Sequence, residues 1–118
     1  MSNFSTATSI AHNVASGAQS AVSIVEEHLQ RITQREEEVH AFNLVTSAEA
    51  RERAADIDAR IARGENVGPL AGVPIALKDN MCTRGVPTTC SSKILEGWKP
   101  PYNATVVDKL FAAGAVFV

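Results

Sequence analysis

The chain has 118 residues, of which 45% are hydrophobic and 20% charged, so its composition suits one modest core and is not that of a disordered chain. Eleven basic and 13 acidic side chains leave a net charge of −2, which argues against autonomous nucleic-acid binding and excludes DNA from the expected partners. The longest apolar stretches, 73–77 and 110–118, are far shorter than the roughly 20 residues of a membrane span. Residues 1–25 lack the basic and apolar blocks of a secretory signal.

Two amphipathic helices are predicted at the start of the chain. The first should end at Gly17; its apolar face would comprise Phe4, Ile10, Ala11 and Val14. The second should be capped by Ser20 or Ser23; its apolar stripe would comprise Val22, Val25, Leu29 and Ile32, with a Glu27–Arg31 pair on the solvent side. Such stripes usually face a core, and that is the preferred interpretation. A partner protein that covers part of them is the alternative.

A third helix should follow a short connection. Residues 41–45 alternate weakly, which is compatible with a strand or an extended link. Residues 46–49 have the form of a capping box, and Gly64 should end the helix that they open. Its apolar face would comprise Ala50, Ala54, Ile57 and Ile61, and its ion pairs Glu49–Arg53 and Asp56–Arg60. We therefore divide the chain into a helical arm, 1–66, and a second unit, 67–118.

The second unit has the pattern of a βαβ crossover. Apolar runs at 73–77 and 115–118 predict buried strands. Between them, a capping box at 105–108 opens a helix that Gly114 should end. The first strand and this helix are separated by a connection, 79–104, far longer than the usual length of about 2 to 6 residues. So long an insertion is usually a functional loop.

Lys78 occupies a position that needs an explanation. It ends the apolar run 73–77, and holding a buried lysine neutral near pH 7 costs about 4 to 5 kcal/mol. Asp79 is the nearest acidic partner, although adjacent strand residues point to opposite faces. The carboxyl end of a strand is also where open α/β sheets bind their ligands. A catalytic role would need a hydroxyl, as in Ser–Lys variants of the catalytic triad, and spacing alone assigns none.

Other reactive side chains carry weaker signals. The hydroxyl-rich segment 88–93 is interpreted as a cap on a short helical turn at 92–95. Cys82 and Cys90 match neither a zinc pair nor a redox motif, so ordinary reduced thiols are expected. The three histidines are too dispersed for a metal cluster, and solvated positions are expected for His12, His28 and His40.

Two runs carry a family likeness. Residues 68–80, GPLAGVPIALKDN, and 85–93, GVPTTCSSK, strongly resemble the amidase signature family, and within it the A subunits of glutamyl-tRNA(Gln) amidotransferases. The resemblance implies an α/β fold: an N-terminal helical arm followed by the first βαβ part of a mixed-sheet amidase domain. It also implies a Ser-cis-Ser-Lys triad in which Lys78 keeps the middle serine poised as a proton relay. The other serine would attack the side-chain amide of glutamine.

The same resemblance implies partners. Ammonia would pass to a partner that activates the glutamate of mischarged tRNA with ATP and Mg²⁺, in a complex with subunits B and C in the cytoplasm or an organelle. This chain itself would bind no cofactor. The family's serine segment lies well beyond Val118, and neither Ser91 nor Ser92 corresponds to it, so the 118-residue chain alone is expected to be inactive. The alternatives are another hydrolase of free amides, or a non-catalytic interaction module.

Overall fold

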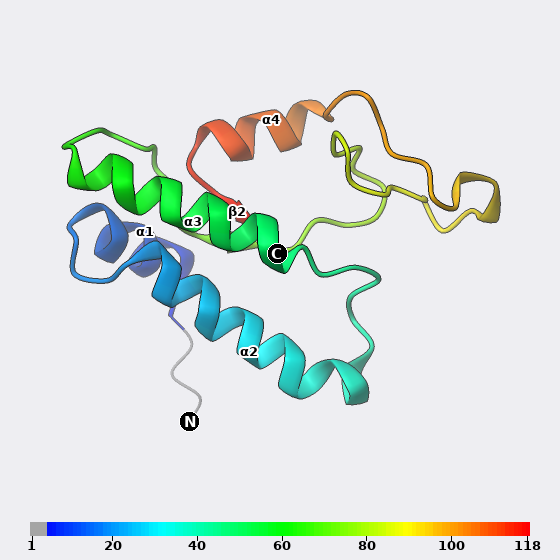
Figure 1. Ribbon diagram of the computed structural model, residues 1–118, viewed down its shortest axis with the longest axis horizontal. Helices are drawn as coiled ribbons and strands as arrows, with labels where there is room; N and C mark the ends of the chain where they lie inside the picture. Colours follow the sequence, from blue (N-terminus) through cyan, green and yellow to red (C-terminus); the bar gives the residue numbers. More distant parts are fainter. Residues whose placement is uncertain (1–4) are drawn as a thin grey trace.

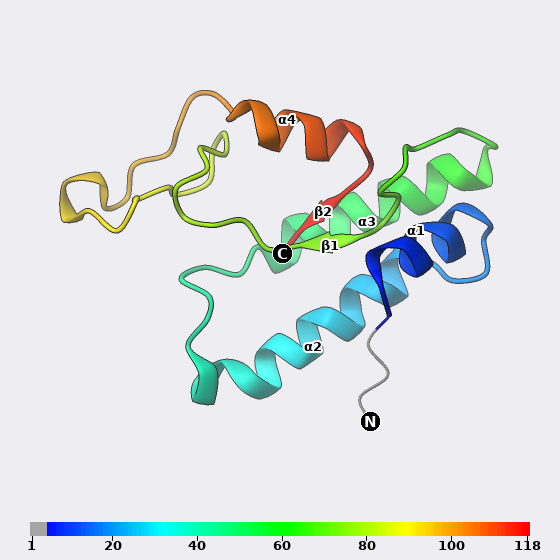
Figure 2. The same cartoon turned by 180° about the vertical axis from the view of Figure 1, so that it is seen from behind.

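The computed structural model describes residues 5–118 and combines helices with a small parallel sheet (Figure 1). The elements in chain order are α1 (Ala7–Ala15), α2 (Ala21–Val39), α3 (Ser47–Ala62), β1 (Pro74–Ile75), the 3-10 turn η1 (Lys93–Leu95), α4 (Thr105–Ala112) and β2 (Val116–Phe117). The two strands pair in parallel, with Pro74 opposite Val116 and Ile75 opposite Phe117. In Figure 2 the sheet lies between α4 on one side and α1 and α2 on the other. The predicted α/β class and the βαβ crossover are confirmed.

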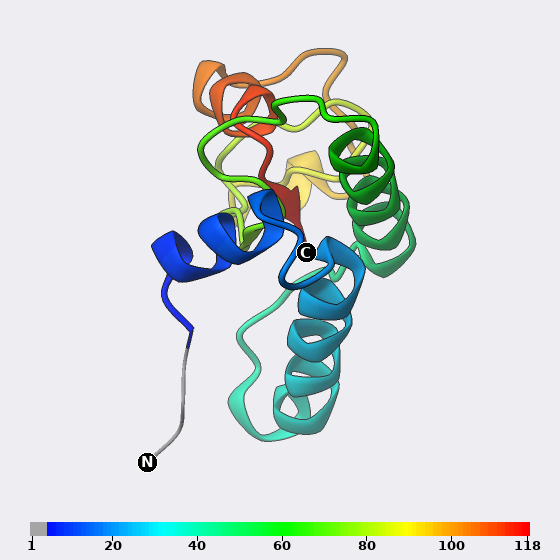
Figure 3. The same cartoon turned by 90° about the vertical axis from the view of Figure 1, so that its left-hand side faces the viewer.

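One apolar core joins the helical arm to the sheet. The end-on view in Figure 3 shows the helices of the arm arranged beside the strands. Its buried members are Ile10, Val14, Ala21, Ile24, Val25, Leu29, Ala50, Ala54, Ile57, Val67, Ala71, Val73 and Val116. The predicted apolar faces of the first and third helices are largely confirmed, except that Phe4 lies outside the described residues. The boundary between residues 66 and 67 stays a prediction.

The stripe on α2 is rotated from its predicted position. Val22 is 36% exposed, whereas Ala21 and Ile24 are buried together with Val25 and Leu29. Ala21 packs closely against the backbone that leads into β1. A Cβ added at Gly72 would stand only 3.0 Å from the Cβ of Ala21. The backbone before β1 thus packs on the Ala21 side of the helix, and Val22 falls at the edge of the covered side.

The start of α2 is capped from two directions. The Ser20 hydroxyl accepts a hydrogen bond from the Ser23 N–H at 3.0 Å, which confirms one of the predicted caps. The carboxylate of Asp58, on α3, accepts from the N–H groups of Ala21 at 2.7 Å and Val22 at 3.1 Å. These donors have no partner inside a helix, and a negative charge is favourable at this end of the helix dipole. Asp58 therefore connects the two long helices.

Replacing Asp58 by alanine should destabilise the chain by about 1 to 2 kcal/mol, the cost of a lost N-cap. The matched control is Asp56→Ala on the same helix, because Asp56 makes only a 3.5 Å ion pair with Arg53 and its side chain is 53% exposed. That control should cost less than about 0.5 kcal/mol. Thermal unfolding followed by circular dichroism measures both. Equal losses in the two variants would contradict a capping role for Asp58.

Both predicted capping boxes are wrong. At the start of α3, Thr46 makes no side-chain cap, and its hydroxyl instead donates to the Phe117 carbonyl at 3.3 Å. Helix α4 begins one residue earlier than predicted, with Ala104 in the cap position. The Asn103 amide beside it donates to the Asp108 carboxylate at 2.9 Å. At the start of α3, the Thr46 hydroxyl is thus engaged by the Phe117 carbonyl on β2 and does not cap the helix.

The arginines of α3 pair with other acidic residues than those predicted. The Glu27–Arg31 pair on α2 is confirmed. On α3, Arg53 pairs with Asp56, and Arg60 pairs with Glu65 at 2.9 Å. The chain turns back after the helix, where the Glu65 N–H donates to the Arg60 carbonyl at 3.0 Å, and this turn brings Glu65 beside Arg60. The pairs Glu49–Arg53 and Asp56–Arg60 are therefore wrong.

The strands are shorter than the apolar runs that predicted them. The run 73–77 forms a strand only at Pro74–Ile75, and 115–118 only at Val116–Phe117. Each strand has the other as its ladder partner within residues 5–118, through bonds from Val116 N to Val73 O at 2.9 Å and from Val118 N to Ile75 O at 3.1 Å. The residues after Ile75 continue as a loop.

The long connection between β1 and α4 folds back on itself. Its two arms are joined by backbone bonds from Gly85 N to Pro100 O, from Thr88 N to Trp98 O and from Ala104 N to Cys82 O, at 3.1, 3.1 and 2.7 Å. The short turn η1 lies at the tip, at the right of Figure 1. Residues 41–45, before α3, form an extended link without strand pairing. The predicted long loop is therefore present, and these backbone hydrogen bonds hold its two halves together.

Candidate functional site

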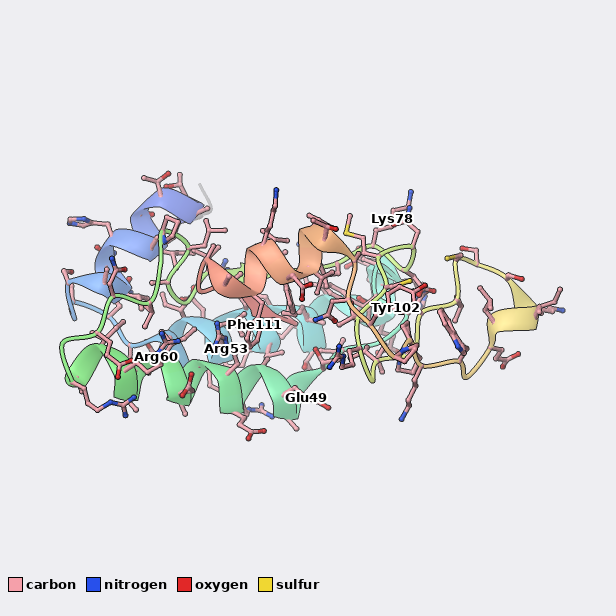
Figure 4. All side chains as sticks on the ribbon, turned by 90° about the horizontal axis from the view of Figure 1, so that it is seen from above. Glu49, Arg53, Arg60, Lys78, Tyr102 and Phe111 are labelled. Atoms are coloured by element: carbon pink, nitrogen blue, oxygen red, sulfur yellow. The ribbon has the colours of Figure 1, made fainter. Side chains whose placement is uncertain are left out.

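Lys78 lies just beyond the carboxyl end of β1, in an exposed position. Its ammonium makes no ion pair or hydrogen bond with any of residues 5–118, and in Figure 4 the side chain points away from the helices. Because β1 ends at Ile75, Lys78 follows it in a loop and pays no cost of burial. The topological prediction is confirmed: Lys78 stands at the end of the sheet where α/β folds bind ligands.

A cavity of about 1000 Å³ opens beside Lys78. Its walls come from the α2–α3 link, from the turn after β1, from the segment around residues 86–91 and from the ends of α4 and β2; they include Leu44, Lys78, Asp79, Cys90, Phe111 and Phe117. Apolar side chains thus form much of the wall. An unpaired amine at the edge of such a space is available for proton transfer.

Asp79 does not pair with its neighbour Lys78. Its carboxylate accepts hydrogen bonds from the Thr89 N–H, at 2.8 Å, and from the Thr89 hydroxyl. The Asn43 amide approaches the same carboxylate at 3.5 Å. The bonds from the Thr89 hydroxyl and N–H hold the pKa of Asp79 below its usual range, so this carboxyl group is ionised near neutral pH. The acidic partner expected for Lys78 is therefore engaged elsewhere.

The hydroxyl-rich segment 88–93 has a different role from the predicted one. The short helical turn is present as η1, but Ser92 makes no side-chain cap there. The buried member is Thr88, 2% exposed, whose hydroxyl donates to the Val86 carbonyl at 3.2 Å. Thr89 holds Asp79, a contact that residue types alone did not reveal. A threonine ten residues after an aspartate carries no recognisable spacing signal.

The cysteines and histidines behave as ordinary side chains. Cys82 and Cys90 are both free thiols, as predicted. The Cys82 sulfur lies 3.9 Å from the Tyr102 hydroxyl, and this contact raises the pKa of Tyr102. His12 and His40 are exposed, while the half-buried His28 contacts the Ile24 carbonyl through Nδ1 at 2.7 Å. Within residues 5–118, no three His, Cys, Asp or Glu side chains are grouped as metal ligands would be.

No helix formed by residues 5–118 is long and apolar enough to cross a membrane.

Arg53 is a further wall residue, and its predicted partner Glu49 is not the one that it contacts. Its guanidinium stands 3.8 Å from the centre of the Phe111 ring, and it donates to the Phe111 carbonyl at 2.8 Å. A cation at the carboxyl end of α4 is favourable for the helix dipole, and Figure 4 shows the two side chains together. Burial lowers the pKa of Arg53. The contact fixes α4 to α3 beside the cavity.

A free amine at the carboxyl end of a parallel sheet, beside a cavity, is an arrangement suited to an enzyme that uses lysine for proton transfer. The sequence model of the amidase family matches residues 23–118. The chain therefore belongs to the amidase family.

Individual relatives show the same relationship. The chain is 53% identical, over 100 residues, to the A subunit of the glutamyl-tRNA(Gln) amidotransferase of Trichormus variabilis, a match that covers 85% of this chain and 21% of the relative. Among solved structures, a bacterial aryl acylamidase of the amidase signature enzymes matches with a TM-score of 0.89 and 30% identity, over 97% of this chain and 24% of that one. A fatty acid amide hydrolase matches with a TM-score of 0.91 and 26% identity, over 96% and 20%. The chain thus spans about a fifth of the length of the curated relative.

Proposed function

We propose that these residues form the N-terminal part of the A subunit of a glutamyl-tRNA(Gln) amidotransferase, which hydrolyses glutamine to supply ammonia. The observation that carries the proposal is the 53% identity to a relative of that name, over most of the chain. The position of Lys78 beside a cavity at the end of β1 supports a catalytic role for that residue.

Lys78 would act as the base of a Ser-cis-Ser-Lys triad. Its amine would hold the middle serine as a proton relay, while the second serine attacks the amide carbon of the glutamine side chain. Ammonia would leave, and water would then hydrolyse the glutamyl ester. Both serines would belong to a part of the amidase domain that these 118 residues do not include. Ser91 and Ser92 are not assigned that role, and Ser91 lies in the segment held by Thr89.

The proposed complex contains subunits B and C in the cytoplasm or an organelle. ATP and Mg²⁺ would be used where the glutamate of mischarged tRNA is activated, on one of these partners, and this chain itself would bind neither of them. The name of the relative describes one chain of a larger enzyme, which supports an assembly of several chains.

A glutamine hydrolysis assay tests the proposal in two forms of the protein. The 118-residue polypeptide alone should release no ammonia, because it would supply one member of a three-residue unit. The complete protein that carries these residues, assembled with subunits B and C, should release ammonia from glutamine. The assembly should also convert Glu-tRNA(Gln) to Gln-tRNA(Gln) when ATP and Mg²⁺ are present.

The similarity to an aryl acylamidase and a fatty acid amide hydrolase favours a second candidate, a hydrolase of free amides. The same assay separates the two. If the complete chain alone hydrolyses simple amides without tRNA and ATP and fails to support transamidation, the hydrolase is the correct assignment. Failure to co-purify with the small amidotransferase subunit would count against the complex.

A further inference from the structure

Asp79 connects the turn that carries Lys78 to the far arm of the long loop. Its carboxylate accepts from the Thr89 N–H at 2.8 Å and from the Thr89 hydroxyl, and its backbone carbonyl accepts from the Cys90 N–H at 2.8 Å. All three bonds join the residue directly after Lys78 to the same short segment. Hydrogen bonds to an ionised carboxylate are stronger than neutral ones. This attachment is therefore a charge-assisted contact directly beside the proposed catalytic lysine.

The segment that Asp79 holds has unusual backbone geometry. Cys90 and Ser91 have φ angles of 50° and 60°, in the left-handed region that non-glycine residues seldom adopt. Such a conformation persists only where its surroundings hold it, and it is often found at functional sites. Here the Cys90 N–H is bonded to the Asp79 carbonyl, and the Ser91 N–H to the Thr89 hydroxyl at 3.2 Å. Thr89 thus connects Asp79 to the strained residues.

The arrangement also affects the lysine amine. Asp79 and Lys78 both line the cavity. A carboxylate without other partners would form an ion pair with a neighbouring ammonium, and the amine would then be occupied. The Asp79 carboxylate is occupied by Thr89, and Asn43 from the α2–α3 link approaches it at 3.5 Å. The Lys78 backbone is held on one side by β1 and on the other by Asp79. The amine itself remains without a partner among residues 5–118.

We propose that Asp79 is a positioning residue for Lys78, and that the Asp79–Thr89 hydrogen bonds hold the lysine in place beside the cavity while leaving its amine unpaired. This inference rests on the proposed function, because it assumes that Lys78 takes part in amide hydrolysis. Asp79 acts through the backbone and through Thr89.

The test uses Thr89→Val in the complete chain, with glutamine as the substrate. Valine has nearly the same shape but lacks the hydroxyl that binds Asp79. We expect kcat to fall about 10- to 100-fold, because a small displacement of a catalytic group has effects of that size. KM should stay within about twofold, since substrate binding is not altered. Thr89→Ser keeps the hydroxyl and should retain activity within about threefold of the parent.

Thr83→Val is the matched control. Thr83 lies in the same loop, and its hydroxyl donates to the Met81 carbonyl at 3.1 Å without contact to Asp79. Thermal unfolding of each variant, together with kcat expressed per folded chain, separates loss of positioning from loss of folded protein. If Thr89→Val does not fold, Asp79→Asn serves in its place, because it keeps the side-chain shape but removes the charge. It should also lower kcat with KM unchanged.

Three results from the Thr89 variants would each overturn the inference: a kcat in Thr89→Val no lower than in Thr83→Val, an equal loss in Thr89→Ser, or an effect confined to KM. Full activity in Asp79→Asn would do the same. Lys78→Ala, measured in the same assay, distinguishes failure of the positioning role from failure of the proposed function. If Lys78→Ala abolishes hydrolysis and Thr89→Val does not impair it, only the positioning role is wrong. If Lys78→Ala is fully active, the catalytic assignment fails as well.

Discussion

Replacing Lys78 by alanine in a complete amidase chain should lower kcat for glutamine hydrolysis by about 10³- to 10⁴-fold, as expected for the loss of a general base. Stability should change by less than about 0.5 kcal/mol, because Lys78 is exposed and has no polar partner among residues 5–118. A large effect on rate combined with a small effect on stability is the expected signature of a catalytic residue. Ammonia release and thermal unfolding measure the two quantities.

Lys93→Ala provides the control for this experiment. Lys93 is an exposed lysine in the same long loop, at the start of η1, so its removal changes net charge equally without touching the proposed site. Its kcat should remain within about twofold of the parent. Severe unfolding of Lys78→Ala, or equal rates in the two variants, would show that Lys78 has no catalytic role.

The second large effect is expected at Gly114, where two backbone segments meet. A Cβ built on Gly114 would stand 2.5 Å from the Val67 carbonyl oxygen, and one built on Gly68 would stand 2.4 Å from the Ala113 carbonyl oxygen. The two segments are joined nearby by the bond from Leu70 N to Ala113 O at 2.8 Å. The close approach allows the end of α4 to pass beside the chain that leads into β1.

Gly114→Ala should therefore destabilise the fold by about 3 to 5 kcal/mol, through steric overlap with backbone added to the cost of a positive φ. Gly64→Ala is the matched control, because Gly64 has a φ of +79° but no atom within 4 Å of the added Cβ. It should cost only about 1 to 2 kcal/mol. Urea unfolding monitored by circular dichroism compares them. Equal destabilisation of the two variants would show that the close approach to Val67 is unimportant.

Periodic apolar patterns predicted the helices well because such patterns depend on neighbours three and four residues apart. Ile10 and Val14 on α1, and Ala50, Ala54 and Ile57 on α3, are buried as expected. Lys78 was singled out by a local pattern too, a charge that directly follows an apolar run. Its position at the carboxyl end of β1 follows from chain order alone.

Features that join distant residues could not be predicted in this way. Asp58 caps a helix that begins 37 residues earlier, and Thr46 bonds to a carbonyl 71 residues away. In sequence Thr46 looked like the start of a capping box, because its nearest partner along the chain was Glu49. The folded chain offers it the Phe117 carbonyl instead, so the local signal was misleading.

The helical arm, the βαβ crossover and the position of Lys78 after an apolar run all follow from the order and spacing of residue types. The surroundings of Lys78 follow from the way the chain folds. It placed the amine outside the core and gave the Asp79 carboxylate to Thr89. The physical reason is that burial and hydrogen-bond partners depend on which segments meet in space, and a carboxylate binds the donors that folding brings within reach.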